Sequence, residues 1–243
     1  MKNIRFDVEY DGTDFCGWQR QPGGIQTLQG ELEAQLGRIL QENISLTAAG
    51  RTDKGVHARL QVVNFMTGSA MELSKMAHAL NSLLPDTVRV SNPHVVPLDF
   101  HARFSAKERE YRYFLLEEPS ALRCRFTGCS KGSLHIGVMQ DAAGLLVGEH
   151  DFLLLSKEPA DKKNPVCLIK ECEWQEENGV FVFRIRANRF LRSMVRYLVG
   201  VMIAVGRGRA VPEDLGMLLD DGLMTFPLFP AEPNGLFLWD VSY

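Results

Sequence analysis

The sequence predicts an α+β protein made of two ferredoxin-like halves, each a split β-α-β unit. Three observations support this fold class. Strand-like and helix-like hydrophobic patterns occur in the order β-α-β-β-α-β, the same order occurs twice, and turn residues separate the elements. We expect antiparallel sheets that form one extended sheet flanked by helices, with one half over residues 1–100 and the other over residues 101–243.

The first half starts with an alternating strand over residues 4–10, which glycine and proline residues end. Leucines at helical spacing predict a core-facing helix over residues 26–41, and a second such stripe predicts a helix over residues 71–84. The other strands expected in this half cover residues 44–48, 60–66 and 88–96.

The second half repeats this order, beginning with a strand over residues 106–116 and a helix over residues 135–147. Its second helix is expected over residues 190–205, where an apolar stripe recurs at helical spacing. The remaining predicted elements are strands over residues 167–174, 180–187 and 236–243 and a short helix over residues 213–219.

Composition places the chain among globular proteins: 243 residues, 45% of them hydrophobic and 23% charged, suffice for one large or two modest domains. No apolar stretch approaches the roughly 20 residues of a membrane-spanning helix. The amino terminus has an acidic residue at position 7 and no apolar signal segment, so we expect a cytoplasmic protein.

The five cysteines are too few for a disulfide scaffold. Cys167 and Cys172 have a spacing that could suggest zinc, but residues five apart on a regular strand point to opposite faces. We therefore expect buried or loop thiols and no metal site.

The distribution of charge is more informative than the net charge of −3. Residues 178–212 contain seven arginines and no acidic residue. A solvated surface is the ordinary alternative for such a run, but the exclusive use of arginine favours phosphate contacts, because a guanidinium fork binds phosphate bidentately. Five of these arginines are candidate RNA ligands, two on one strand face and three on a narrow arc of the next predicted helix: Arg184, Arg186, Arg189, Arg192 and Arg196.

The loop Ala-Gly-Arg-Thr-Asp-Lys-Gly-Val-His-Ala, residues 49–58, joins two predicted strands. Glycines near both ends allow a tight excursion of the chain. An aspartate in a turn ordinarily caps nearby N–H groups. Here Arg51, two residues before Asp53, can keep the carboxylate ionised and oriented, as a nucleophile requires. Asp53 is therefore the candidate catalytic residue.

Six further motifs follow the same chain in order: Tyr10-Asp11-Gly12 with Gly17-Trp18-Gln19-Arg20-Gln21, Asp99-Phe100-His101-Ala102-Arg103-Phe104-Ser105-Ala106, Tyr111-Arg112-Tyr113, Gly148-Glu149-His150-Asp151-Phe152, Met194-Val195-Arg196 with Val199-Gly200, and Gly235-Leu236-Phe237-Leu238. With the loop at residues 49–58, these motifs make the sequence resemble the tRNA pseudouridine synthase A family nearly end to end.

The resemblance implies isomerisation of uridine to pseudouridine in the anticodon stem-loop of tRNA, without cofactor or metal, by a homodimer. Asp53 matches the catalytic aspartate and Arg51 its salt-bridge partner, while Tyr111 matches the tyrosine that stacks on the target uracil. We assign three residues to binding of the substrate base: Tyr111, Arg196 and Leu236. We assign Arg20 to binding of RNA. The alternative for Tyr111 is a core aromatic residue. The alternative for Arg196 is a phosphate clamp remote from the base. We assign His57 no catalytic role.

The reaction explains why a single carboxylate suffices. Glycosidases that admit water use two carboxylates, whereas the departing uracil anion here is itself the nucleophile that recaptures the sugar. Asp53 either attacks C1′ or removes the C2′ proton, and water must be excluded.

Two other functions compete with this interpretation: a pseudouridine synthase that acts on a different RNA site, and a non-catalytic tRNA-binding module. A phosphotransferase is disfavoured, because the loop has no second acid to hold magnesium and the chain has no G-x4-G-K-[ST] motif.

Overall fold

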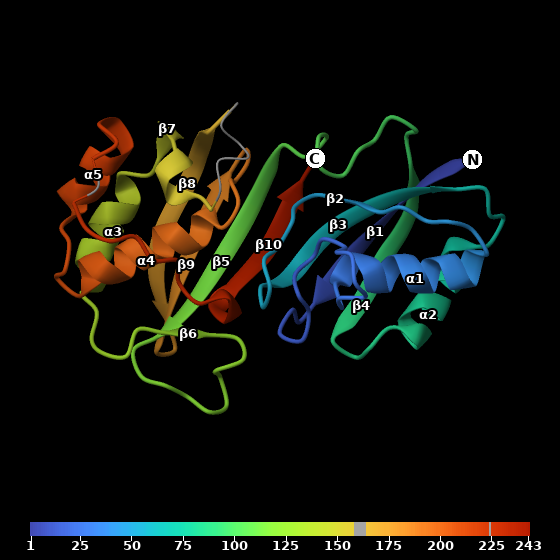
Figure 1. Ribbon diagram of the computed structural model, residues 1–243, viewed down its shortest axis with the longest axis horizontal. Helices are drawn as coiled ribbons and strands as arrows, with labels where there is room; N and C mark the ends of the chain where they lie inside the picture. Colours follow the sequence, from blue (N-terminus) through green and yellow to red (C-terminus); the bar gives the residue numbers. More distant parts are fainter. Residues whose placement is uncertain (158–163, 224) are drawn as a thin grey trace. The chain divides into compact units, whose positions relative to one another are not determined.

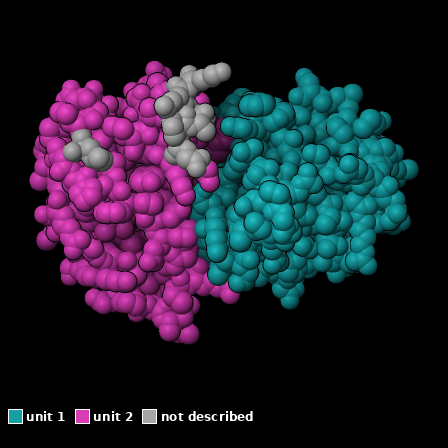
Figure 2. All heavy atoms as spheres, viewed as in Figure 1, with its two compact units in different colours: residues 1–107, 238–243 teal, residues 108–237 magenta. Residues whose placement is uncertain are grey.

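The computed structural model describes residues 1–157, 164–223 and 225–243, and the chain divides into two compact units. Unit 1 comprises residues 1–107 and 238–243, and unit 2 comprises residues 108–237 (Figure 2). The division falls at residue 107, whereas the sequence predicted it at residue 100. Residues 238–243, predicted to belong to the second half, lie in unit 1.

Unit 1 has the β-α-β-β-α-β order predicted for the first half. Its strands pair antiparallel in the order β4-β1-β3, and β2 pairs with β3, which is the ferredoxin-like arrangement. A further strand, β10 (Leu236–Ser242), lies next to β3, which explains why residues 238–243 belong to unit 1. The other elements are β1 (Lys2–Tyr10), α1 (Leu28–Leu40), β2 (Thr47–Ala48), β3 (His57–Thr67), α2 (Leu73–Leu83) and β4 (Val88–Val96).

One face of this sheet is apolar because β1 alternates, with Ile4, Phe6 and Val8 at most 1% exposed. The helices α1 and α2 contact one another and cover this face (Figure 1). The buried stripe of α1 includes leucines at helical spacing, among them Leu28 and Leu32. Burial of these side chains stabilises unit 1 and fixes α1 against the sheet.

Unit 2 also consists of a mainly antiparallel sheet with helices, so the α+β fold class is confirmed. Its sheet has the order β5-β9-β8-β7, and the short strand β6 pairs parallel with β5. The short strands β6 and β7 were not predicted, because two to four residues are too few to show a period. The elements are β5 (Glu108–Leu116), β6 (Gly128–Cys129), α3 (Ile136–Gly144), β7 (Gly148–Asp151), β8 (Val166–Glu177), β9 (Val180–Ala187), α4 (Met194–Gly206) and α5 (Pro212–Asp220).

The helix α4 begins four residues later than the apolar stripe predicted. Phe190 and Leu191 continue that stripe, but Ser193 adopts a left-handed conformation with φ of 58° immediately before the helix. Arg189 and Arg192 therefore precede α4, and only Arg196 lies on it. The prediction that these three arginines share one helical arc is wrong.

The expectation that Cys167 and Cys172 point to opposite faces of β8 is also wrong. A β-bulge interrupts the pairing of β8 with β9 between Ile169 and Glu171 and inserts one residue into the alternation. Both cysteines are consequently buried, at 0% and 7% exposure. Over residues 1–157, 164–223 and 225–243, no group of three metal-binding side chains gathers, and no helix is long and apolar enough to cross a membrane.

Candidate active site

The loop at residues 49–58 joins β2 to β3 in unit 1, and a buried glutamine fixes its base. The amide of Gln61 donates to Gly50 O at 2.7 Å and accepts from Gly50 N at 3.3 Å. Ala49 N also donates to Val62 O at 2.8 Å. Gln61 is 0% exposed, so this amide pair is shielded from competing water. The loop therefore leaves the sheet in one defined direction.

The middle of the loop is held at Thr52, the residue before the candidate catalytic aspartate. Trp18 N donates to Thr52 O at 3.0 Å, and the Tyr10 hydroxyl lies 2.8 Å from Thr52 Oγ1. Gly17 has φ of +86°, and a Cβ there would lie 2.9 Å from Thr52 O. Glycine is needed at this position both for its conformation and for the close approach of two backbones.

The end of the loop is held at His57, which is 0% exposed. Gly12 N donates to His57 Nδ1 at 3.1 Å, and Asp11 Oδ1 also lies 3.1 Å from this nitrogen. A Cβ on Gly12 would lie 2.0 Å from Val56 O, so this glycine too permits contact between the loop and the segment after β1. These contacts give His57 a structural role in the loop.

Asp53 is half-buried between these fixed points. Val56 N donates to Asp53 O at 3.2 Å, and Gly55 has φ of +78°, so the chain turns directly after the aspartate. Arg51 is exposed on the same loop. The ion pair between Arg51 and Asp53, which the resemblance implies, stays a prediction.

Two further candidate site residues, Tyr111 and Arg196, lie in unit 2. Tyr111, on β5, is 8% exposed, and the ring of Phe190 packs edge-on against it at 5.1 Å between centroids. On α4, Arg196 Nε donates to Ala231 O at 2.8 Å, and Ala231 N donates to Arg196 O at 2.8 Å. Both side chains are thus fixed in orientation by their own unit.

Two glycines of unit 2, Gly200 and Gly235, also permit close contacts. A Cβ on Gly200 of α4 would lie 1.9 Å from Phe229 O, so the chain before Ala231 runs against the helix. A Cβ on Gly235 would lie 2.7 Å from Gly128 N and 2.7 Å from Phe114 O. Leu236, which follows, is 5% exposed at the start of β10.

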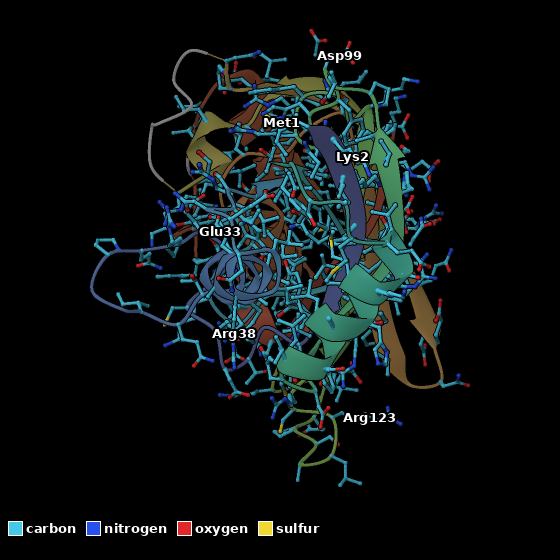
Figure 3. All side chains as sticks on the ribbon, turned by 90° about the vertical axis from the view of Figure 1, so that its right-hand side faces the viewer. Met1, Lys2, Glu33, Arg38, Asp99 and Arg123 are labelled. Carbon is cyan, nitrogen blue, oxygen red and sulfur yellow. The ribbon has the colours of Figure 1, made fainter. Side chains whose placement is uncertain are left out.

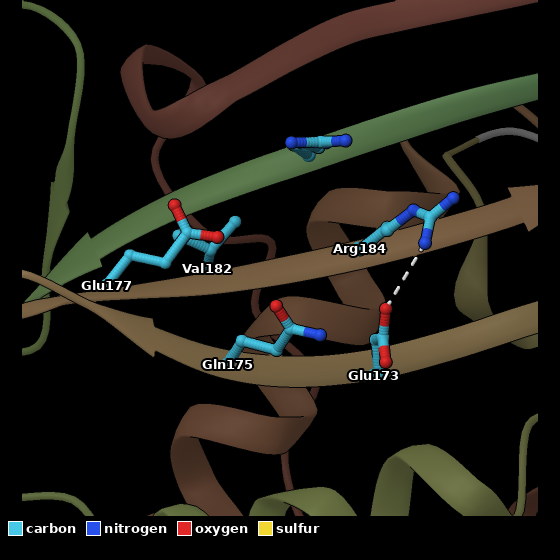
Figure 4. Close-up of a pocket in the computed structure, with 6 residues that line it drawn as sticks. Glu173, Gln175, Glu177, Val182 and Arg184 are labelled. Atoms are coloured by element: carbon cyan, nitrogen blue, oxygen red, sulfur yellow. Dashed lines mark hydrogen bonds and ion pairs between the residues drawn. The ribbon is translucent and has the colours of Figure 1, made fainter.

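The arginines of β9 take part in ion pairs, which the sequence did not reveal. Glu110 of β5 is 4% exposed on its side chain and lies 2.9 Å from Arg112 Nε, 3.1 Å from Arg184 Nε and 2.8 Å from Arg186 Nη2. Arg184 also pairs with Glu173 of β8 at 3.3 Å (Figure 4). The acidic partners come from β5 and β8, the strands on either side of β9.

This network fixes the charge of its members. Burial by itself raises the pKa of Glu110, but hydrogen bonds from Arg186, Arg184 and Arg112 outweigh burial and bring the pKa below its ordinary value. Hydrogen bonds to Glu110 raise the pKa of Arg184 and Arg186. The depression beside these strands is lined by mixed charges and polar groups, as Figure 4 shows: Arg112, Glu173, Gln175, Glu177, Val182 and Arg184.

The other arginines predicted to bind RNA differ in exposure. The side chain of Arg20 in unit 1 is 65% exposed, and its Nη1 lies 3.1 Å from Glu33 Oε2. In unit 2, Arg192 is exposed and Arg189 is half-buried. The predicted residues thus fall into two sets: Arg20, Arg51 and Asp53 in unit 1, and Tyr111, Arg184, Arg186, Arg189, Arg192, Arg196 and Leu236 in unit 2.

Three residues that organise the loop and its neighbours were not predicted from the sequence: Gln61, Thr52 and Glu33. A signal was present for two of them. Gln61 is a polar residue inside the apolar strand predicted at residues 60–66, and Glu33 follows Leu32 in the leucine-rich helix. A polar side chain at such a position is expected to be buried with hydrogen-bonding partners.

A carboxylate held on a clamped loop of an α+β protein, with arginines in both units, is compatible with chemistry on a nucleic acid. A family model described as tRNA pseudouridine synthase matches residues 8–105 and 142–243. The chain therefore belongs to the tRNA pseudouridine synthase family, and it is an isomerase that acts on tRNA.

Relatives named tRNA pseudouridine synthase A match the whole chain. One from Pelodictyon phaeoclathratiforme is 59% identical and covers 100% of both chains. One from Chlorobium phaeobacteroides is 54% identical over 100% of this chain and 94% of the relative. A more distant one from Exiguobacterium is 36% identical over 100% of this chain and 98% of the relative.

Proposed function

We propose that the chain isomerises uridine to pseudouridine in the anticodon stem-loop of tRNA, with Asp53 as the catalytic carboxylate. The observation that carries this proposal is the clamping of the Asp53 loop at three points: Gln61 holds its base, Trp18 holds its middle, and Gly12 donates to His57 at its end. A loop held at three points keeps its carboxylate in one place, and such positioning lowers the barrier of a reaction at a bound sugar.

The reaction leaves the composition of the nucleotide unchanged. The N1–C1′ bond breaks, and the uracil, released as an anion, rotates within the site. C5 then bonds to C1′, the C5 proton leaves to solvent, and N1 takes up a proton. Asp53 supports this sequence in one of two ways: it attacks C1′ and is later displaced by C5, or it removes the C2′ proton to give a glycal that is reprotonated when C5 adds. In both cases the carboxylate returns to its initial state.

The substrate base has to leave its stack to reach a protein carboxylate. Flipping a nucleotide costs roughly a few kcal/mol, which stacking on an aromatic ring and phosphate contacts offset. We assign the stacking to Tyr111, whose orientation Phe190 fixes. Arg196 and Leu236 complete the base pocket, and Arg51 pairs with Asp53 and orients its carboxylate.

The tRNA backbone requires cations beyond the pocket. We assign this role to Arg20, Arg189 and Arg192, and to a lesser extent to Arg184 and Arg186, because glutamates already partly neutralise the last two. Arg123 supports an additional contact, since it is exposed on a segment that lacks acidic residues from 119 to 140 (Figure 3). A homodimer acting in the cytoplasm, where tRNA is present, completes this proposal.

The test is tritium release from tRNA transcripts labelled at uridine C5, with Asp53→Asn compared with the unaltered protein. We expect Asp53→Asn to lower the rate of tritium release at least about 10³-fold. Binding of tRNA should persist in the variant. Pseudouridine mapping then locates the product. Product in another arm of the tRNA would contradict the anticodon assignment.

The two competing functions give different results in the same assay. A synthase with another target releases tritium from a different RNA, and product mapping identifies the position. A tRNA-binding module binds the transcripts without releasing tritium, and Asp53→Asn leaves its function unchanged.

A further inference from the structure

The buried carboxylate of Glu33 joins helix α1 to the segment that supports the Asp53 loop. Its side chain is 5% exposed. Glu33 Oε1 accepts from Gln29 Nε2 at 2.9 Å and from Leu46 N at 2.9 Å, while Oε2 lies 3.1 Å from Arg20 Nη1. Figure 3, which looks nearly along the axis of α1, labels Glu33 beside this helix. A buried charge is costly, so this arrangement calls for a role other than packing.

Gln29 extends the connection to the backbone of the same segment. Its Oε1 accepts from Arg20 N at 3.1 Å, and its backbone N donates to Trp18 O at 2.9 Å. Gln29 is only 8% exposed, which shields these bonds from water. The helix therefore fixes both the backbone and the side chain of Arg20.

The segment held in this way contacts the catalytic loop directly. Trp18 N donates to Thr52 O, one residue before Asp53, and Gly17 packs against the backbone of residues 52–54. Arg20 is thus two residues from a backbone bond to the loop that carries Asp53. Its side chain nevertheless remains 65% exposed, with a guanidinium that can donate to a ligand on its open side.

We propose that Glu33 is a positioning residue that holds the Arg20 guanidinium beside the Asp53 loop as a binding group for an RNA backbone phosphate near the target uridine. This inference rests on the proposed function. A lysine-like flexible cation would lose side-chain entropy on binding, whereas a guanidinium already oriented by a buried carboxylate loses less. Glu33 does not touch the substrate and acts only through Arg20.

The experiment is a double-mutant cycle on the tritium-release assay with tRNA transcripts. Arg20→Ala, Glu33→Gln and the double variant are compared for kcat, KM and melting temperature. Each single variant is expected to raise KM about tenfold and to change kcat less than about twofold, as loss of one charge-assisted phosphate contact requires. The double variant is expected to raise KM no further, because both changes remove the same contact.

Glu31→Gln is the matched control, since it removes the same charge from the same helix two residues away. A native KM for Glu33→Gln with a lowered melting temperature would show a purely structural glutamate and overturn the proposal, as would additive effects in the cycle. If Glu33→Gln does not fold, Arg20→Ala decides alone, because an unchanged KM would leave Glu33 with nothing to position. Absence of tritium release by the unaltered protein would instead reject the proposed function.

Discussion

At the scale of single residues, the Asp53 loop depends on glycines that belong to a different part of the chain. Gly12 and Gly17 lie after β1, and each faces loop backbone across a distance that leaves no room for a side chain. The close approach lets Trp18 N reach Thr52 O and lets Gly12 N reach His57. The loop conformation is therefore built as much by the segment after β1 as by its own residues.

Gly17→Ala should test this dependence. We expect a loss of about 2–4 kcal/mol in the free energy of unfolding, from a left-handed alanine combined with overlap against Thr52 O, and a lower kcat because Asp53 shifts. Thermal or denaturant unfolding and tritium release measure the two effects.

Gly23→Ala is the control, because Gly23 has φ of +82° but nothing within 4 Å of its added Cβ. This substitution should lower the free energy of unfolding by only about 1 kcal/mol and leave kcat unchanged. Equal effects of the two substitutions would mean that backbone strain, and not the contact with the loop, accounts for the Gly17 result.

At the scale of elements, the strands β5, β9 and β8 share a face on which arginines and glutamates alternate across strands. Glu110 is central to it, because three arginines contact its carboxylate. Its neighbours on β8, Glu171 and Glu173, pair with the Arg184 side chain as well. Cross-strand pairs of opposite charge stabilise the sheet and set its register.

This face should make the stability of unit 2 depend on pH. Since the folded pKa of Glu110 lies below its ordinary value of 4.5, unfolded chains take up this proton at a higher pH than folded ones. The stabilisation is therefore present above about pH 4.5 and is lost as pH falls through the folded pKa. We expect the melting temperature of Glu110→Gln to be lower at pH 7 and to fall less steeply between pH 5 and 3.

Glu177→Gln serves as the control, since it removes a carboxylate from the exposed end of β8. Its melting temperature should follow the unaltered protein over the same range. Parallel curves for Glu110→Gln and the unaltered protein would contradict the role assigned to Glu110.

Sequence periodicity located most elements because their buried faces have a regular spacing. The leucine stripe of α1 and the alternation of β1 fall where they were expected, within about two residues. Periodicity failed where the backbone departs from regular geometry: at the β8 bulge, which places both Cys167 and Cys172 in the core, and at Ser193, whose left-handed conformation delays α4.

The partners of charged side chains were harder to predict than the buried apolar faces, for a physical reason. The stretch of residues 178–212 contains no acidic residue, but strand pairing brings Glu110 and Glu173 beside Arg184. Linear sequence does not contain this proximity. The residues of the Asp53 loop indicated a candidate site from the sequence alone. The partners of Gln61 and Glu33 became visible only in the structure.

At the scale of the whole molecule, unit 1 is discontinuous in sequence. Residues 238–243 return to it after the whole of unit 2. Their contacts are substantial: Leu238 is 0% exposed, the Tyr243 hydroxyl donates to Ala102 O at 2.8 Å, and the Arg59 guanidinium lies 5.0 Å from the centre of the Trp239 ring. Unit 1 should therefore be sensitive to changes in this distant part of the chain.

Leu238→Ala should lower the free energy of unfolding by about 2–5 kcal/mol, and the loss should be confined to unit 1. Hydrogen exchange of the backbone amides measures the location of the effect, and we expect faster exchange in β1 and β3 than in β8 and β9. Leu218→Ala in α5, where Leu218 is 4% exposed, should give the opposite pattern. Equal loss of protection in both units for either variant would show that the units unfold together.

The return of residues 238–243 to unit 1 also has a consequence for synthesis on the ribosome. Domains generally fold in order as they emerge, at roughly 5–20 residues per second. Here the nascent unit 1 waits on the order of 10 s, while residues 108–237 are translated, before its last strand can pair with β3. During that interval the edge of β3 that β10 later covers is open to other strands, so the newborn chain has a period of exposure to misassembly that the finished protein does not.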